Sequence, residues 1–150
     1  MIGSLLLGAL LAGCGADDPP MVTFATDATV VQARPTQYCD LKLRDCASDA
    51  KAPVRLLVPP GASLRVQVPD TVATTPWVVV FSYRDATGAQ SDARSKVFAP
   101  NERRDYTLEL PAPTDQLVTA QVQQYGPPPE AAPNGELQFP VRSSWVLNVG

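Results

Sequence analysis

The sequence contains no histidine among its 150 residues. This absence excludes Ser-His-Asp and Cys-His catalysis, metal sites built on histidine, and any pH switch that works through an imidazole. A strong excess of one charge is also lacking, because 12 Lys and Arg stand against 15 Asp and Glu, a net charge of −3. Affinity for nucleic acid comes largely from neutralised phosphates, so we expect no nucleic-acid partner.

Glycine is scarce, at 9 residues, whereas proline is abundant, at 16. Each proline lacks a backbone donor and breaks a helix or a central strand. The prolines recur at short intervals, so long helices are not expected after the N-terminal segment. Short strands between proline-marked turns are expected instead, which is typical of an all-β protein.

Long hydrophobic runs are absent except for a short one at residues 5–11, which is too short to span a bilayer. It ends in Leu-Ala-Gly-Cys at residues 11–14, the pattern of a bacterial lipobox. We therefore predict a cleaved lipoprotein signal peptide at 1–13, a diacylglycerol on the Cys14 thiol, and a lipidated tether at 14–21. A plain signal peptide or a buried core segment is the alternative. The segment before the run has no Lys or Arg, so we expect the natural start codon to lie further upstream.

Only three cysteines are present. If Cys14 carries lipid, Cys39 and Cys46 remain as an even pair, and an oxidising envelope favours a disulfide between them. It would close an eight-residue loop, for which the chain-entropy model gives about 2–2.5 kcal/mol of stabilisation. The Cys-x-x-Cys spacing of redox sites is missing, so we interpret the pair as a structural crosslink.

Alternating hydrophobicity predicts strands along the rest of the chain. The clearest are residues 64–68 and residues 77–83, where Trp77, Val79, Phe81 and Tyr83 would share one face. Further strands are expected at 22–25, 29–33, 54–58, 96–98, 106–110, 117–125 and 145–149, with Val118, Ala120 and Val122 on one face of the 117–125 strand.

These strands predict a single domain over residues 22–150. The expected fold is all-β, an immunoglobulin- or fibronectin-like β-sandwich of about seven to nine short strands. Trp77, Tyr106 and Trp145 lie within alternating strands, so we expect them in the core, with an aromatic ligand platform as the alternative.

Three patterns suggest chemistry only weakly. Ser48 and Lys51 match Ser-x-x-Lys, but that chemistry needs the serine at a helix start, and no Lys-Thr-Gly or Ser-Asp-Asn partner exists. Asp40, Asp45 and Asp49 match no calcium loop, so we expect no metal site. Paired carboxylates for glycoside cleavage stay an open alternative, since only a fold brings them together. No catalytic residue and no cofactor are predicted.

The proline-rich stretch at residues 126–135 is the best candidate for a binding loop, because loops on a sandwich commonly carry recognition. Its candidate residues are Gly126, Pro127, Pro128, Pro129, Asn134 and Gly135. The alternative is a rigid hairpin loop ending in an Asn-Gly turn.

Several motifs together resemble a known family. They are Pro-Thr-Gln-Tyr-Cys-Asp at 35–40 with Cys46, Val-Pro-Pro-Gly at 58–61, Thr-Pro-Trp at 75–77 running to Phe81-x-Tyr83-Arg84-Asp85, Val-Phe-Ala-Pro-x-Glu-Arg at 97–103, Tyr-Thr-Leu-Glu-Leu-Pro at 106–111 with Asp-Gln-Leu at 115–117, Val-Gln-Gln-Tyr-Gly at 122–126, and Trp-Val-Leu at 145–147. They look like actinobacterial lipoproteins classed as domain of unknown function 2771, over nearly the whole mature chain. The resemblance implies an envelope lipoprotein of mycolic-acid-containing bacteria, with no known activity, ligand or catalytic residue.

From these observations we expect a protein held on the outer face of the cell membrane by lipid at Cys14. Its expected role is a non-enzymatic binding or scaffolding module whose loops contact an envelope protein or a glycolipid. A lipid or glycolipid carrier is the alternative, which would need an apolar cavity large enough for an acyl chain. A hydrolase that uses carboxylates alone is a third possibility.

Overall fold

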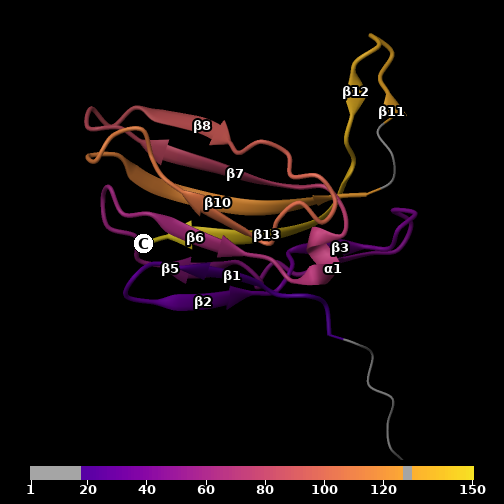
Figure 1. Ribbon diagram of the computed structural model, residues 1–150, viewed down its shortest axis with the longest axis horizontal. Helices are drawn as coiled ribbons and strands as arrows, with labels where there is room; N and C mark the ends of the chain where they lie inside the picture. The colour runs from indigo at the N-terminus through magenta and orange to yellow at the C-terminus, as the bar shows by residue number, and fades with distance from the viewer. Residues whose placement is uncertain (1–17, 127–129) are drawn as a thin grey trace, which may run out of the picture.

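The computed structural model describes residues 18–126 and 130–150, which fold into an all-β body of two facing sheets (Figure 1). The first sheet has four antiparallel strands in the order β2-β1-β6-β9. Their bounds are β1 Val22–Ala25, β2 Val30–Ala33, β6 Leu64–Gln67 and β9 Asp105–Leu108. Clean alternation of apolar and polar residues in β6 explains why one face of this sheet is buried and the other exposed.

The second sheet has seven strands in the order β4-β3-β13-β10-β7-β8, and β5 pairs with β13 in parallel. Their bounds are β3 Gln37–Cys39, β4 Cys46–Ser48, β5 Val54–Leu56, β7 Trp77–Arg84, β8 Gln90–Arg94, β10 Gln116–Tyr125 and β13 Val141–Val149. A separate hairpin is formed by β11 (Glu130–Ala131) and β12 (Leu137–Gln138).

The core lies between the two sheets and draws side chains from both. Phe24 and Leu64 of the first sheet and Val79, Val122 and Trp145 of the second belong to one buried cluster. Trp77 and Trp145 are fully buried, as predicted. Tyr106 is only half-buried and packs at the margin of the cluster, against the ring of Phe98.

Strand β10 differs from the prediction in which residues face the core. The register between β10 and β7 shifts between Leu117 and Thr119, so one extra residue occupies the strand there. Because of this bulge, Leu117 is buried together with Ala120 and Val122, and Val118 is only half-buried. The predicted shared face of Val118, Ala120 and Val122 is therefore confirmed for Ala120 and Val122 and wrong for Val118, whose place in the core is taken by Leu117.

The structure contains thirteen strands within the described ranges, more than the seven to nine expected. The extra strands are short or polar. Strand β8 is largely exposed and carries Asp92 and Arg94, and β3 and β4 flank the disulfide loop. Residues 96–98, expected as a strand, make only a single bridge between Phe98 and Trp77.

Helix is confined, among the described residues, to one turn, α1 (Asp70–Ala73). No helix in the part of the chain that the structure describes is long and apolar enough to cross a membrane.

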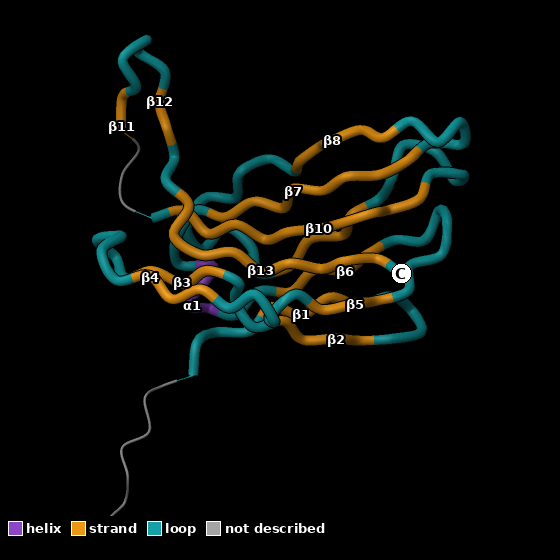
Figure 2. The backbone as a smooth tube through the Cα atoms, turned by 180° about the vertical axis from the view of Figure 1, so that it is seen from behind, coloured by secondary structure: helices purple, strands orange, loops and turns teal. Residues whose placement is uncertain are grey.

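The N-terminal segment joins the body at the end of the sandwich where β1 begins and β3 and β4 lie (Figure 2). The indole Nε1–H of Trp145 donates to the carbonyl oxygen of Pro20 at 2.9 Å. Pro19 lines the same surface hollow as Tyr38 and Asp49 in this region. The C-terminus and the turn after β7 lie at the opposite end. We call the first of these the tether end and the second the far end.

Gly61 and Gly88 provide a matched test of the fold, because both have positive φ, +74° and +84°. A Cβ at Gly61 would overlap the carbonyl oxygen of Pro113, whereas a Cβ at Gly88 would meet open space. We expect Gly88→Ala to cost only the left-handed strain of about 1–2 kcal/mol. Gly61→Ala should cost about 1–3 kcal/mol more, through the overlap with backbone. Urea unfolding of both variants checks this, and equal midpoints would contradict the close approach at Gly61.

Candidate functional site at the tether end

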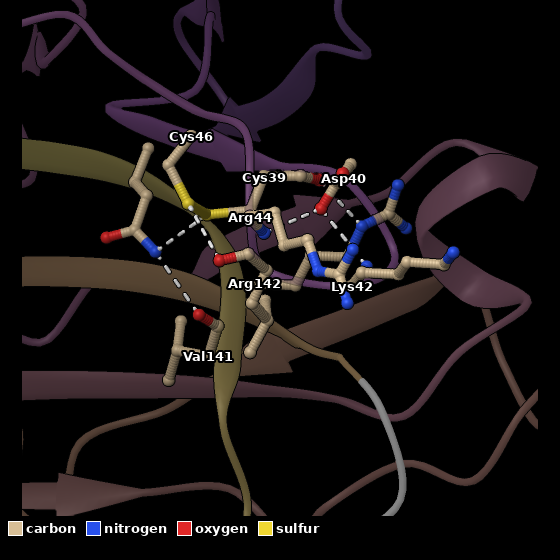
Figure 3. The surroundings of a disulfide bond; sticks show 9 residues. Cys39, Asp40, Lys42, Arg44, Cys46, Val141 and Arg142 are labelled. Carbon is tan, nitrogen blue, oxygen red and sulfur yellow. Dashed lines mark hydrogen bonds between the residues drawn. A yellow bond between two sulfur atoms is a disulfide. The ribbon is translucent and has the colours of Figure 1, made fainter.

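The hairpin of β3 and β4 is closed by a disulfide between Cys39 and Cys46 (Figure 3), as predicted. The two cysteines are directly paired across the hairpin, with their Cα atoms 4.0 Å apart. Cys39 is buried and Cys46 is exposed, so the bridge joins an outer strand to an inner one. The crosslink fixes a short polar hairpin that has little core of its own.

The turn of this hairpin is organised by Asp40. One carboxylate oxygen of Asp40 accepts the backbone N–H of Lys42 at 3.1 Å and that of Arg44 at 2.8 Å. These donors, with Arg44 first among them, hold the pKa of Asp40 below its ordinary value of 3.8. Leu43, in the same turn, adopts a left-handed conformation with φ +56°. The hydrogen bonds to the Asp40 carboxylate therefore hold the turn in one conformation.

Contacts to β13 fasten the hairpin to the body. The Nε–H of Arg142 donates to the carbonyl oxygen of Cys39 at 2.9 Å, and its guanidinium lies 5.5 Å from the centre of the Tyr38 ring. The side-chain amide of Gln37 donates to the carbonyl oxygen of Val141 at 3.2 Å. Figure 3 shows Arg142 lying beside the disulfide.

Two hollows flank the hairpin and share Tyr38 and Ala47 in their walls. The smaller has a volume of about 240 Å³ and is lined mainly by apolar surface, with the ion pair of Arg34 and Asp49 (3.0 Å) at its edge. The larger, about 600 Å³, is an open depression that contains Arg44 and Arg142. Both are surface features, outside the packed space between the sheets.

The predicted binding loop forms the second hairpin, an arm of β11 and β12 that rises from the tether end across the direction of the long strands (Figures 1 and 2). Asn134 accepts the N–H of Glu136 at 3.1 Å, and Gly135 has φ +85°, so the expected Asn-Gly turn is present. At the base, a Cβ on Gly126 would come within 3.2 Å of Leu43 and 3.3 Å of Arg142. The arm and the disulfide hairpin thus meet.

Some predicted residues lie outside what the structure describes. Cys14 and the signal segment 1–13 fall there, as do Pro127, Pro128 and Pro129. The structure accordingly describes three of the six candidate loop residues, Gly126, Asn134 and Gly135, and residues 18–21 of the predicted tether.

The weaker chemical patterns do not assemble into a site. Ser48 ends strand β4 and is exposed, so it lacks the helix start that Ser-x-x-Lys chemistry requires. Asp49 instead accepts the N–H of Lys51 and pairs with Arg34. Within residues 18–126 and 130–150, no group of three or more Asp, Glu, Cys or His residues is placed to hold a metal ion.

Sequence reasoning missed the residues that fasten the hairpin, namely Gln37, Tyr38 and Arg142. Arg142 had one visible signal, since it is a lone cation within the mostly uncharged strand β13. Its role depends on pairing between strands that are more than 90 residues apart. A single sequence shows no pattern from which such pairing can be predicted.

The two facing sheets and the disulfide hairpin at the tether end define the class of protein. It is a small, disulfide-bearing all-β domain with a β-sandwich-like body. The chain belongs to the family described as protein of unknown function (DUF2771), whose model matches residues 16–150. No curated protein and no solved structure matches the chain.

The disulfide should contribute measurably to stability. Replacing both cysteines, Cys39→Ala with Cys46→Ala, is expected to lower the free energy of unfolding by about 2–2.5 kcal/mol, because the unfolded chain regains loop entropy. Urea unfolding measures the loss, and wild-type protein with reductant is the control that should shift equally. Intact mass should rise by two protons on reduction. Identical unfolding midpoints with and without reductant would contradict the role assigned to this bridge.

The turn held by Asp40 should open in acid. Since the pKa of Asp40 is lowered in the folded protein, its carboxylate stabilises the turn above the ordinary value of 3.8, and this contribution is lost as the pH falls below it. We expect the amides of Lys42 and Arg44 to lose hydrogen-exchange protection in that range, relative to other loop amides. Asp40→Ala should remove the protection at neutral pH, whereas Asp40→Asn, which keeps an acceptor oxygen, should retain part of it. Protection unaffected by Asp40→Ala would refute this account.

Proposed function

We propose that this protein is a lipid-anchored protein of the actinobacterial cell envelope, held on the extracytoplasmic face of the cell membrane by diacylglycerol on Cys14. In this proposal residues 1–13 are removed and 14–21 form the tether. The sandwich acts as a non-enzymatic binding or scaffolding module. Its loops carry the contact to an envelope protein or a glycolipid.

The disulfide carries this proposal. Cys39 and Cys46 are joined to each other, which is the state favoured in an oxidising compartment outside the cytoplasm. Of the three cysteines in the sequence, this leaves Cys14, which ends the lipobox-like sequence. Export and lipidation together account for the use of every cysteine.

The arrangement of strands supports the immunoglobulin-like interpretation of the fold. One sheet contains β1-β6-β9 and the other β13-β10-β7-β8, the neighbour relations of strands A-B-E and G-F-C-C′ in that fold. Trp77 is fully buried on β7, in the place of strand C. Immunoglobulin-like sandwiches commonly use end loops for recognition, so this topology supports a binding module.

Packing of the interior favours a binding module over a lipid carrier. The space between the sheets is filled by large buried side chains, which include Trp77, Trp145 and Phe98. An acyl chain would have to displace them, at the cost of close-packed contacts. The lowered pKa of Asp40 also argues against its use as the general acid of a hydrolase, because a general acid needs a raised pKa.

Lipidation at Cys14 can be tested directly in a mycolic-acid-containing host. Cys14→Ala should abolish incorporation of labelled fatty acid, because it removes the only thiol proposed as acceptor. The variant should also leave the membrane fraction, since stable anchoring needs the long acyl chains. The double variant Cys39→Ala with Cys46→Ala is the matched control and should keep the label. A label that persists on Cys14→Ala protein would overturn the anchoring proposal.

A further inference from the structure

Four of the large exposed apolar residues lie on segments at the tether end. Seven large hydrophobic residues are exposed in the described chain: Met21, Val30, Leu41, Leu57, Val97, Leu137 and Phe139. Leu41 is in the disulfide hairpin, Leu137 and Phe139 are in the arm, and Met21 is at the start of the body. Leu41 is 66% exposed, Leu137 63% and Phe139 45%. Large apolar groups exposed together mark an interaction surface, whereas single ones need no explanation.

These apolar residues sit on elements that contact one another. Gly126, at the base of the arm, lies against Leu43 of the disulfide turn. The ring of Phe139 packs on that of Tyr125, with centroids 5.4 Å apart, which fixes Phe139 to the last residue of β10. The arm crosses the direction of the long strands (Figure 1), so the arm and the hairpin together present a broad end face.

The length of the tether determines which end of the body can face the membrane. Pro20 is fixed to the body by Trp145, and five residues lie between it and Cys14, so six Cα-to-Cα steps join the two. A fully extended chain of that length reaches about 20 Å at most. Strand β10 alone, with ten residues, spans about 30 Å. If lipid on Cys14 is in the bilayer, the tether is too short to let the body turn its far end to the membrane and its tether end to solvent.

Charge at this surface nearly cancels. In the disulfide turn, Asp40 and Asp45 balance Lys42 and Arg44. The surface therefore has no strong attraction for anionic headgroups, and its affinity for a membrane must come from apolar contact in the interfacial region.

We propose that the tether end rests on the lipid bilayer, with Leu41 of the disulfide hairpin and Phe139 of the arm inserted among the headgroups. This inference rests on the proposed lipid at Cys14 and deepens it, because it makes the bilayer itself the surface that this end contacts. The disulfide holds the hairpin in the shape that presents Leu41.

Tryptophan scanning of the full lipidated protein in phosphatidylcholine vesicles with brominated acyl chains tests this contact. Leu41→Trp and Phe139→Trp each place a probe at the proposed surface. Leu57→Trp is the matched control, because Leu57 is 74% exposed and lies at the far end. The native Trp77 and Trp145 are fully buried and give a constant background. Intact mass of the same samples reports whether Cys14 carries lipid.

We expect the brominated lipid to quench the added emission at positions 41 and 139, and aqueous iodide to quench only that at 57. Adding the anionic lipid phosphatidylglycerol should not change the quenching. If quenching at 41 and 139 required this lipid, the contact would be electrostatic, which would overturn the proposed apolar contact. Iodide quenching at all three positions would show a free surface and overturn the inference while leaving an acylated Cys14 intact. Shielding of 41 and 139 from both quenchers would overturn it in favour of contact with a second copy of the chain. An unmodified Cys14 would refute the proposed function itself, and this inference with it.

Discussion

Pairing of β13 with three other strands is the interaction on which the rest of the structure depends. Its length is hydrogen-bonded to β10, its beginning to β3 and its end to β5. Through β3 it carries the disulfide hairpin, and through Trp145 it holds the backbone at Pro20. Because this one strand contacts the core, the disulfide hairpin and the N-terminal segment, it fixes the positions of these three parts relative to one another.

The two hairpins at the tether end are stabilised by interactions other than burial in the core. The hairpin of β3 and β4 has a mostly exposed outer strand, and its order comes from the disulfide, from the carboxylate of Asp40 and from Arg142. The arm relies on its own turn and on Phe139 against Tyr125. Such elements contribute little to the core, so their order depends on these local interactions.

Much of the fold could be predicted from the sequence because alternation and turn chemistry are local. The strand around residues 77–83, the burial of Trp77 and Trp145, and the turns at Gly61 and Gly88 all follow from such patterns. Strand β8 could not be predicted, since its residues are polar and it forms only because β7 offers an edge. The bulge in β10 was missed because it shows only in the register against β7.

By itself, the sequence determined the all-β class, the pairing of Cys39 with Cys46 and the Asn-Gly turn of the arm, because each depends on residues close together in the chain or on a count of cysteines. Tertiary structure alone decided that the disulfide hairpin, the arm and the N-terminal segment meet at one end, and that Arg142 fastens the hairpin. These relations depend on contacts between residues far apart in the chain, 108 residues for Thr36 and Ser144 and 125 residues for Pro20 and Trp145. Long-range pairing of that kind is set by the packing of two sheets around a shared core, which no local pattern encodes.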